Sequence, residues 1–514
     1  MMNKRLKQGS TFLLALALAF PLLTLPGARA ANAIKTDRKC SVAFNVSGED
    51  NELTADGTNI KVNLYKVADV DVSGNYTATK DFTGLDVSSV RADNNDAASK
   101  WAERAKKAKE KLSDSVKPVD TVTLTGGIGN KDGLDTGLYL VDTPEVVTTN
   151  YTYTFTPYLV SLPTNNYYSS GNDDWIYDLI ATNAIGLKPE EHARYGDLVI
   201  NKTLANHNAT TGKKATFVFQ IDITPLKSDK TETRIESLDF EAAGNSSVTI
   251  TKIPAGAAVT VKEVYSGASY KLTSANDQKA KIVATDRGAK VDSTSVSSVS
   301  FTNDIDNNMN GGYGVKNNFK LNENGQYQYT EPAEKNYEGG VGMRKLHKKP
   351  LIMATATLAL TGTLAVGSAM AYFTTYTTAG GGVTMNMGFT KTIPNETVDK
   401  DGKHVTITNT GDYDCFVRVK AFAPMELTYT APNGGWKAED DGYWHYEGVL
   451  PAGETTPKLN ISYKFPEGKD KPEEFNIVVI QECTPVLYDE NGKPYPDWNH
   501  VITTETTEDS KTTE

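Results

Sequence analysis

The stretch "YGDLVINKTL", residues 195 to 204, alternates apolar and polar residues, which is the pattern of a half-buried β-strand. Successive side chains of a strand point to opposite faces, so Lys202 lies on the apolar face of this strand. The other residues on that face are Leu198, Ile200 and Leu204. An isolated buried ammonium group costs several kcal/mol, because it loses its water. We therefore expect Lys202 to have a partner inside the core.

Two later strands repeat this pattern with other polar residues. In "VTVKEVY", residues 259 to 265, Glu263 lies on the apolar face, and in "SVSFTND", residues 298 to 304, Asn303 does the same. The apolar residues on these two faces are Val259, Val261 and Tyr265 in the first strand and Val299, Phe301 and Ile305 in the second. Three strands therefore each direct one polar side chain toward what should be a core.

The three polar residues form a set that can react. If burial lowers the pKa of Lys202 and raises the pKa of Glu263, the neutral amine can attack the side-chain amide of Asn303. Glu263 would carry the proton, ammonia would leave, and a Lys–Asn isopeptide bond would join the first and last strands. Alternation alone also fits a second interpretation, in which Lys202 reaches solvent from a strand end and Asn303 is a turn residue.

The segments around these three positions resemble a known family. "YGDLVINKTL", "TKIPAGAAVTVKEVYSGASYKLTS" and "VSFTNDI" resemble the isopeptide-bearing, CnaB-like domains of Gram-positive pilins. The Lys, Glu and Asn of that family fall at Lys202, Glu263 and Asn303. The resemblance implies an immunoglobulin-like β-sandwich over residues 195 to 305. It also implies that Glu263 is the catalytic residue for autocatalytic formation of a Lys202–Asn303 isopeptide bond.

The preceding region, residues 31 to 190, looks like the N-terminal β domain of sortase-assembled major pilins. The similar segments are "KVNLYKVADVDVSGNY", "GLYLVDTPE", "YTFTPYLVSLPTNN" and "DDWIYDL". In that family, sortase joins a lysine that follows a Trp-containing strand to the next subunit, and the equivalent here is Lys188. Lys188 lies farther from its Trp and precedes Pro189, so an ordinary linker lysine is the alternative. Sortase substrates carry an LPxTG-like signal. Two Leu-Pro segments of this chain do not match it: Leu162-Pro163-Thr164-Asn165 and Leu450-Pro451-Ala452-Gly453.

The composition favours several exported β domains over one enzyme-like core. The chain has 514 residues, a net charge of -11 and three cysteines. It begins with a signal-peptide pattern: Lys4, Arg5 and Lys7, an apolar run over residues 12 to 25, and a cleavage site ending at Ala30. The negative charge argues against nucleic acid as a partner. The cysteines and scattered histidines form no metal-binding or nucleophile signature, so we expect no metal, no cofactor and no enzyme.

One helix and two polar segments interrupt the strand pattern. Over residues 96 to 113 one helical face is apolar, which predicts a surface helix on the first sandwich. That face consists of Trp101, Ala105, Ala108 and Leu112. Residues 306 to 342 are rich in Asn and Gly and are predicted to be a loose tail or linker. Residues 502 to 514 are predicted to be an acidic disordered tail.

A second export signal is predicted inside the chain, at residues 343 to 371. A basic segment, residues 344 to 349, precedes an apolar run over residues 351 to 373 that contains Ala369-Met370-Ala371. As a membrane span, this segment would leave its basic end outside, against the positive-inside rule. As a signal peptide that begins at Met343 and is cut after Ala371, the same residues fall in the expected order.

The residues after this signal resemble the secreted fibre proteins of the TasA/camelysin class. The resemblance rests on "AMAYFTTYTTAGGGV" and "VTITNTGDYDCFVRVKAFAP". It implies a jelly-roll-like β-sandwich over residues 372 to 501 that forms matrix fibres, in which a strand from Tyr372 completes the sheet of a neighbour. By alternation, Cys415 and Cys483 point into one core, so they are a candidate disulfide if their strands are adjacent.

The chain therefore looks like two export units joined in frame. The codons for Glu338-Gly339-Gly340 can contain a bacterial ribosome-binding sequence, just before a start codon at Met343. Our first hypothesis is therefore that two neighbouring genes have been read as one. The alternative is a genuine fusion that two signal peptidases process. The predicted function is a pilin that polymerises with other pilin subunits at the cell wall, supporting adhesion and biofilm, joined to a matrix-fibre protein. The alternative function is a surface adhesin for a host or matrix ligand that does not polymerise.

The two export signals predict two mature products in the native cell. Intact mass spectrometry of surface protein should detect separate species near residues 31–342 and 372–514, because each signal peptide is removed by its own peptidase. A single species that retains residues 343 to 371 would contradict the second signal.

Overall fold

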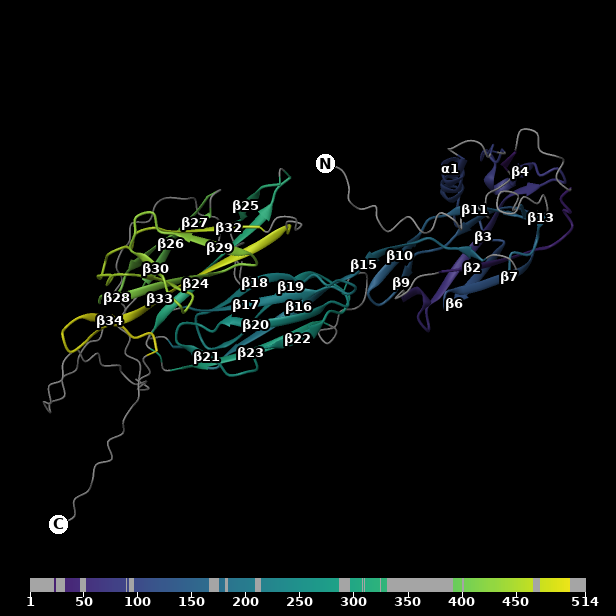
Figure 1. Cartoon of the computed structure of the whole chain (residues 1–514). Coiled ribbons are helices and arrows are strands. Elements are labelled where there is room, and N and C mark those ends of the chain that lie inside the picture. Colours follow the sequence, from purple (N-terminus) through teal and green to yellow (C-terminus); the bar gives the residue numbers. More distant parts are fainter. Residues whose placement is uncertain are drawn as a thin grey trace, which may run out of the picture. The chain divides into compact units, whose positions relative to one another are not determined.

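The computed structural model describes residues 23–24, 33–46, 52–88, 90–91, 97–165, 175–180, 184–208, 214–285, 296–306, 308, 310–323, 325–330, 392–399, 402–465 and 472–499. These residues form β-strands in several sheets and one α-helix, so the all-β prediction is confirmed (Figure 1). The chain divides into two compact units. The first contains residues 1–196, 254–256 and 283–290, and the second contains residues 197–253, 257–282 and 291–514.

A long, mainly antiparallel sheet, in which only the described edge strand β14 runs parallel to its neighbour β2, is the centre of the first unit. Its strands lie in the order β11-β8-β3-β6-β7-β2-β14, and β4 pairs with β3. Their bounds are β2 Cys40–Asn45, β3 Asn59–Val70, β4 Tyr76–Ala78, β6 Asp120–Thr125, β7 Ile128–Leu134, β8 Gly137–Asp142, β11 Tyr158–Leu162 and β14 Ile185–Gly186. A smaller sheet contains β9 Val146–Val147, β10 Tyr151–Phe155 and β15 Pro189–Ala193. The aromatic side chains of β10 and the apolar side chains of the large sheet form one core.

The short elements of this unit are two strand pairs and two single turns of 3-10 helix. The strand pairs are β1 Leu23–Thr24 with β5 Val90–Arg91, and β12 Thr164–Asn165 with β13 Trp175–Ile176. The 3-10 turns cover Glu52–Thr54 and Lys80–Phe82.

The predicted surface helix is confirmed. Helix α1 runs over Ala97–Glu110 and ends three residues before the predicted boundary. Trp101, Ala105 and Ala108 are buried in a cluster with apolar residues of β3, β8 and β11, and Leu112 packs against this cluster just after the helix. The amphipathic pattern therefore identified the correct face, which lies on the large sheet.

The second unit contains two β-sandwiches, of which the first has two four-stranded sheets. One sheet has the order β19-β16-β23-β21, and the other has the order β18-β17-β20-β22. The bounds are β16 Tyr195–Leu204, β17 Ala215–Thr224, β18 Glu232–Phe240, β19 Gly244–Pro254, β20 Ala258–Tyr265, β21 Tyr270–Leu272, β22 Gln278–Lys281 and β23 Ser297–Ile305. Their inward side chains form one apolar core between the sheets.

One predicted core position in this sandwich is wrong. Alternation placed Tyr265 on the same face as Glu263, but a β-bulge shifts the register between β17 and β20 at this point. Phe219 lies opposite Glu263, and Val218 lies opposite Tyr265, so Val264 is the extra residue. Tyr265 therefore joins a separate apolar cluster instead of the core between the sheets.

The second sandwich of this unit includes strands that the sequence had assigned to a loose tail. One sheet has the order β25-β24-β33-β28-β31-β30, with β34 paired to β33, and the other has the order β26-β27-β32-β29. The bounds are β24 Gly311–Leu321, β25 Tyr327–Thr330, β26 Thr392–Asp399, β27 Gly402–Asn409, β28 Cys415–Phe422, β29 Glu426–Thr430, β30 Trp436–Ala438, β31 Trp444–Tyr446, β32 Leu459–Lys464, β33 Glu474–Tyr488 and β34 Pro494–Pro496. Residues 311–321 and 327–330 are thus strands, because β24 has a long pairing partner in β33.

All three cysteines are buried. Cys415 and Cys483 lie on the adjacent strands β28 and β33, within one core, as the alternation indicated. The register places Val417 opposite Cys483, so Cys415 is a diagonal neighbour. Diagonal neighbours are about 7–8 Å apart between Cα atoms, which is longer than the usual disulfide separation of about 4.4–6.8 Å. The register does not favour the predicted disulfide.

Both predicted cleavage sites, at Ala30 and Ala371, lie outside the described residues, as does the internal signal at residues 343 to 371. Within the ranges that the structure describes, no helix is both long and apolar enough to cross a membrane.

Candidate functional site

The three polar residues singled out in the sequence meet inside the first sandwich of the second unit. Strands β16 and β23 are parallel neighbours, with Leu204 opposite Asn303, so Lys202 and Asn303 are close on the same face. Glu263 reaches them from β20, in the facing sheet. Lys202 and Asn303 are completely buried, and Glu263 is 4% exposed. The alternative in which Lys202 reaches solvent is therefore wrong.

Each member of this triad contacts the other two. Lys202 Nζ donates to Glu263 Oε2 at 2.5 Å and also contacts Asn303 Oδ1. Asn303 Nδ2 donates to Glu263 Oε1 at 2.6 Å. The carboxyl group thus bridges the amine and the amide nitrogen, with one oxygen on each. This is the position from which one group can move a proton between those two nitrogens.

Aromatic rings surround the amine. Lys202 Nζ lies 4.3 Å from the centre of the Phe217 ring and 5.9 Å from that of Phe219, both on β17. Burial among these rings lowers the pKa of Lys202 from 10.5 to about 8, although the Glu263 carboxylate opposes part of the fall. The neutral amine, which alone is a nucleophile, is therefore far more abundant near physiological pH than for an exposed lysine, although the charged form still predominates.

Two further contacts hold the triad in place. Asn303 Nδ2 also donates to the carbonyl oxygen of Ser266 at 3.3 Å, and Asn276 Oδ1 accepts the backbone N–H of Glu263 at 2.8 Å. The sequence analysis did not identify these residues or the two phenylalanines. The alternation of "ATFVFQIDI" could have indicated Phe217 and Phe219, whereas a turn residue such as Asn276 carries no signal of its own.

Lys188, the proposed sortase-linked residue, belongs to the first unit, whereas the triad belongs to the second. It connects β14 to β15 and is partly buried, and burial lowers its pKa. Its carbonyl oxygen accepts the backbone N–H of Thr156 at 3.4 Å. Among the described residues, no group of three or more His, Cys, Asp or Glu side chains could hold a metal ion.

A family model matches the sandwich that contains the triad. Residues 198–306 match a family described as a domain of unknown function, DUF5979. No curated protein sequence matches the chain.

The structural neighbours include Gram-positive pilins at low identity. A streptococcal ancillary pilin is 13% identical, with 58% of this chain and 81% of the pilin covered and a TM-score of 0.19. The minor pilin GBS52 of Streptococcus agalactiae is 11% identical, with 52% of this chain and 96% of the pilin covered and a TM-score of 0.17. The Corynebacterium diphtheriae major pilin SpaA is 13% identical, with 52% of this chain and 100% of the pilin covered and a TM-score of 0.17.

The depressed pKa of Lys202 gives a pH test of whether the amine has reacted. In Asn303→Ala, Lys202 stays a free amine, so between about pH 8 and 10.5 the unfolded state binds more protons than the folded state. Its free energy of unfolding should therefore rise with pH across that window and be flat just below it. In the wild type an amide nitrogen would replace the amine and remove this rise.

The measurement is urea unfolding of both proteins across that pH range. Titrating groups elsewhere are common to the two proteins, so the difference between the two slopes isolates Lys202. Parallel slopes would contradict a reacted Lys202 in the wild type.

Proposed function

We propose that this chain is a structural subunit of cell-surface fimbriae, stabilised by an isopeptide bond between Lys202 and Asn303. The observation that supports it best is the closed triad, in which a buried amine, a carboxyl group and an amide contact one another. A buried ion pair gains little net stability from its charges, because their desolvation offsets the attraction. A bond that consumes the amine removes the cost of burying an ammonium group and ties the first strand of the sandwich to the last.

The proposed reaction balances with no external reagent. The neutral Nζ of Lys202 attacks Cγ of Asn303, and a new C–N bond forms as the bond from Cγ to Nδ2 breaks. Glu263 takes a proton from the attacking nitrogen and delivers one to Nδ2, which leaves as ammonia. Glu263 is regenerated, but Lys202 and Asn303 are consumed. The chain therefore reacts once with itself and is not an enzyme in the sense of turnover.

The rest of the proposal concerns assembly and place. The resemblance of residues 31 to 190 to major pilins supports a homopolymer linked by sortase at the cell wall, in which Lys188 provides the amine. The sorting signal that such a linkage also needs is not supplied by either of the two Leu-Pro segments named above. The resemblance of residues 372 to 501 to TasA/camelysin proteins supports a second, matrix-fibre role. Covalent polymers would favour the pilin function. Fibres that dissolve in denaturant would favour the matrix-fibre function. Ligand binding without polymerisation would favour the adhesin.

Glu263→Gln should prevent the bond while keeping the shape of the side chain. Wild-type protein should be lighter than its sequence by about 17 Da, one ammonia, whereas the variant should have its full mass. The bond closes a loop of about 100 residues, for which the cross-link model gives about 4–5 kcal/mol. The variant should therefore lose about 20 °C or more in Tm, measured by calorimetry beside the intact mass.

Glu236→Gln is the matched control. Glu236 also contacts a lysine and an asparagine, Lys316 and Asn476, but lies outside the closed triad. This variant should lose ammonia as the wild type does. A wild-type protein of full mass would contradict the proposed bond.

Lys188→Arg tests the linkage between subunits. Arginine keeps the charge but cannot act as the amine nucleophile, so covalent ladders that survive boiling in detergent should disappear from cells that express sortase. Lys100→Arg, on the exposed face of α1, should leave the ladders unchanged. Ladders that persist in Lys188→Arg would assign the linkage to another lysine.

A further inference from the structure

A strand from before the internal signal completes the sheet of the sandwich that lies after it. Strand β24 pairs antiparallel with β33 along its length, from Gly311 opposite Cys483 to Lys320 opposite Glu474. Strand β25 then pairs with β24. Residues 331 to 391 separate this hairpin from β26, the next strand of the same sandwich. Segments on opposite sides of the predicted signal thus share one sheet.

Side chains of the hairpin also enter the core of this sandwich. Phe319 is 2% exposed and stacks on Phe475, with ring centres 4.9 Å apart and planes only 6° from parallel. Tyr327 stacks on Phe465 at 5.0 Å, and its hydroxyl donates to the carbonyl oxygen of Pro472 at 2.7 Å. The hairpin is therefore part of the core, and removing Phe319 would leave a cavity.

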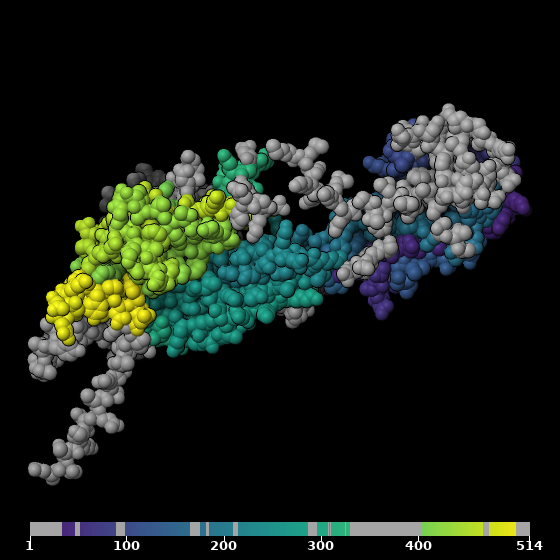
Figure 2. Space-filling model, viewed as in Figure 1, coloured from purple at the N-terminus to yellow at the C-terminus, as the bar shows by residue number. Residues whose placement is uncertain are grey.

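Gly314 fits β24 between two neighbours. A Cβ at this position would lie 2.5 Å from Ile480 Cδ1 on β33 and 2.8 Å from Thr216 Cγ2 on β17. The N–H of Gly314 donates to Thr216 Oγ1 at 2.8 Å. Strand β17 belongs to the sandwich that contains Lys202, Glu263 and Asn303, which we call the triad sandwich, so β24 contacts both sandwiches of the second unit. Figure 2 shows the triad sandwich in teal and the second sandwich in green to yellow.

A mixed apolar and polar surface joins the same two sandwiches. The apolar part consists of Val218, Ile235, Tyr265, Val478 and Ile480. Beside it, Glu236 contacts Lys316 of β24, and Asn476 of β33 donates to the carbonyl oxygen of Ile235 at 3.1 Å. The side chain of Lys316 is 29% exposed, whereas Lys202 is completely buried, so the Lys316–Glu236 pair is the more accessible to water.

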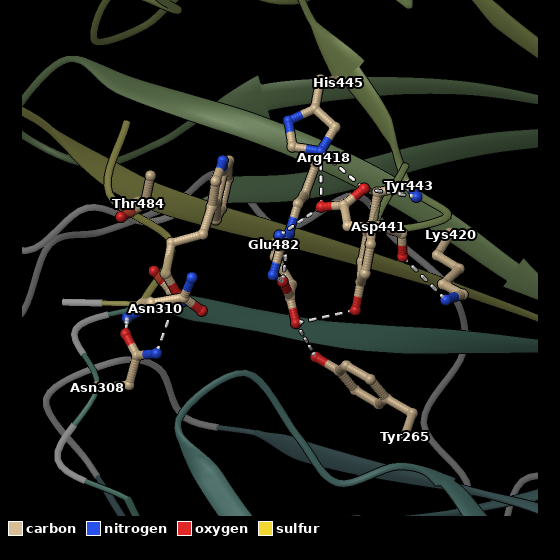
Figure 3. Close-up of polar contacts among 12 residues, drawn as sticks. Tyr265, Asn308, Asn310, Arg418, Lys420, Asp441, Tyr443, His445, Glu482 and Thr484 are labelled. Carbon is tan, nitrogen blue, oxygen red and sulfur yellow. Dashed lines mark hydrogen bonds and ion pairs between the residues drawn. The ribbon is translucent and has the colours of Figure 1, made fainter. Parts of the chain in front are cut away.

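A buried carboxylate anchors the other end of this surface (Figure 3). Glu482, on β33, is 3% exposed and accepts a hydrogen bond from the hydroxyl of Tyr265 at 2.9 Å. It also accepts one from Arg418 Nε at 2.7 Å. The Arg418 guanidinium lies over the rings of Tyr443 and Trp498, with its Cζ 4.1 Å and 4.2 Å from the respective ring centres. Each charge thus has its partner, so burial at this surface leaves neither uncompensated.

We propose that residues 392–499 are a binding partner for residues 197–330, and that β24 is the strand that this partner accepts. The two parts then stay together when the chain between them is cut. If the export units mature separately, the first product carries β24 and the second carries the acceptor edge of β33. The complex is non-covalent and does not depend on the Lys202–Asn303 bond.

The test uses the full exported chain with a specific protease site inserted after Lys335. The purified protein is cut and passed over a size-exclusion column with light scattering. We expect one species with the mass of the uncut chain, which separates into two in denaturant. Two separate species without denaturant would overturn the proposal.

Variants of β24 test whether this strand keeps the two cut fragments together. Phe319→Ala should weaken the cut complex at least about 100-fold, because it removes a buried ring. Gly314→Val should weaken it through the clash with Ile480 and Thr216. Lys320→Ala, at an exposed position of the same strand, should bind as the wild type does. If both buried variants bind as tightly as Lys320→Ala, β24 is not the accepted strand.

Glu263→Gln separates this proposal from the proposed function. The cut complex of this variant should remain intact, because Glu263 lies in the core of the triad sandwich and not at the surface between the sandwiches. Dissociation of this variant, with the wild type intact, would overturn the independence of the complex from the bond.

Discussion

A lysine amine in an apolar core is the constraint on which the triad sandwich depends. Lys202 is completely buried, with Phe217 beside its amine. Such a group must be neutral, paired or consumed. Glu263 pairs with it and lies on the opposite sheet, so the same contact that compensates the charge also joins the two sheets. Asn303, on the strand parallel to that of Lys202, provides the group that can consume the amine. The strand order, the sheet packing and the chemistry therefore depend on one another.

The second sandwich is held by a different kind of interaction. Its attachment to the first sandwich of the unit relies on strand pairing, stacked rings and a compensated carboxylate. Glu236 shows why position matters more than composition. It contacts a lysine and an asparagine, as Glu263 does, but its lysine is partly exposed. The same residue types form an ion pair at the surface and a reactive set in a core.

Much of the triad and the helix could be predicted because both depend on local periodicity. Alternation indicated correctly that the three triad residues lie inward, and helical spacing indicated correctly that Trp101 lies on the buried face of α1. Tyr265 was misplaced because a bulge depends on the neighbouring strand and leaves no mark in a single strand. Strand β24 was missed because its Gly- and Asn-rich sequence has weak strand propensity and gains its order from β33, more than 150 residues later.

The most direct test of the account is tandem mass spectrometry of proteolytic peptides from the native protein. The account predicts a branched peptide in which the side chain of Lys202 is joined to that of Asn303, and fragment ions would locate both residues. Linear peptides that contain unmodified Lys202 and unmodified Asn303 would contradict it, because the triad would then be an ordinary buried ion pair.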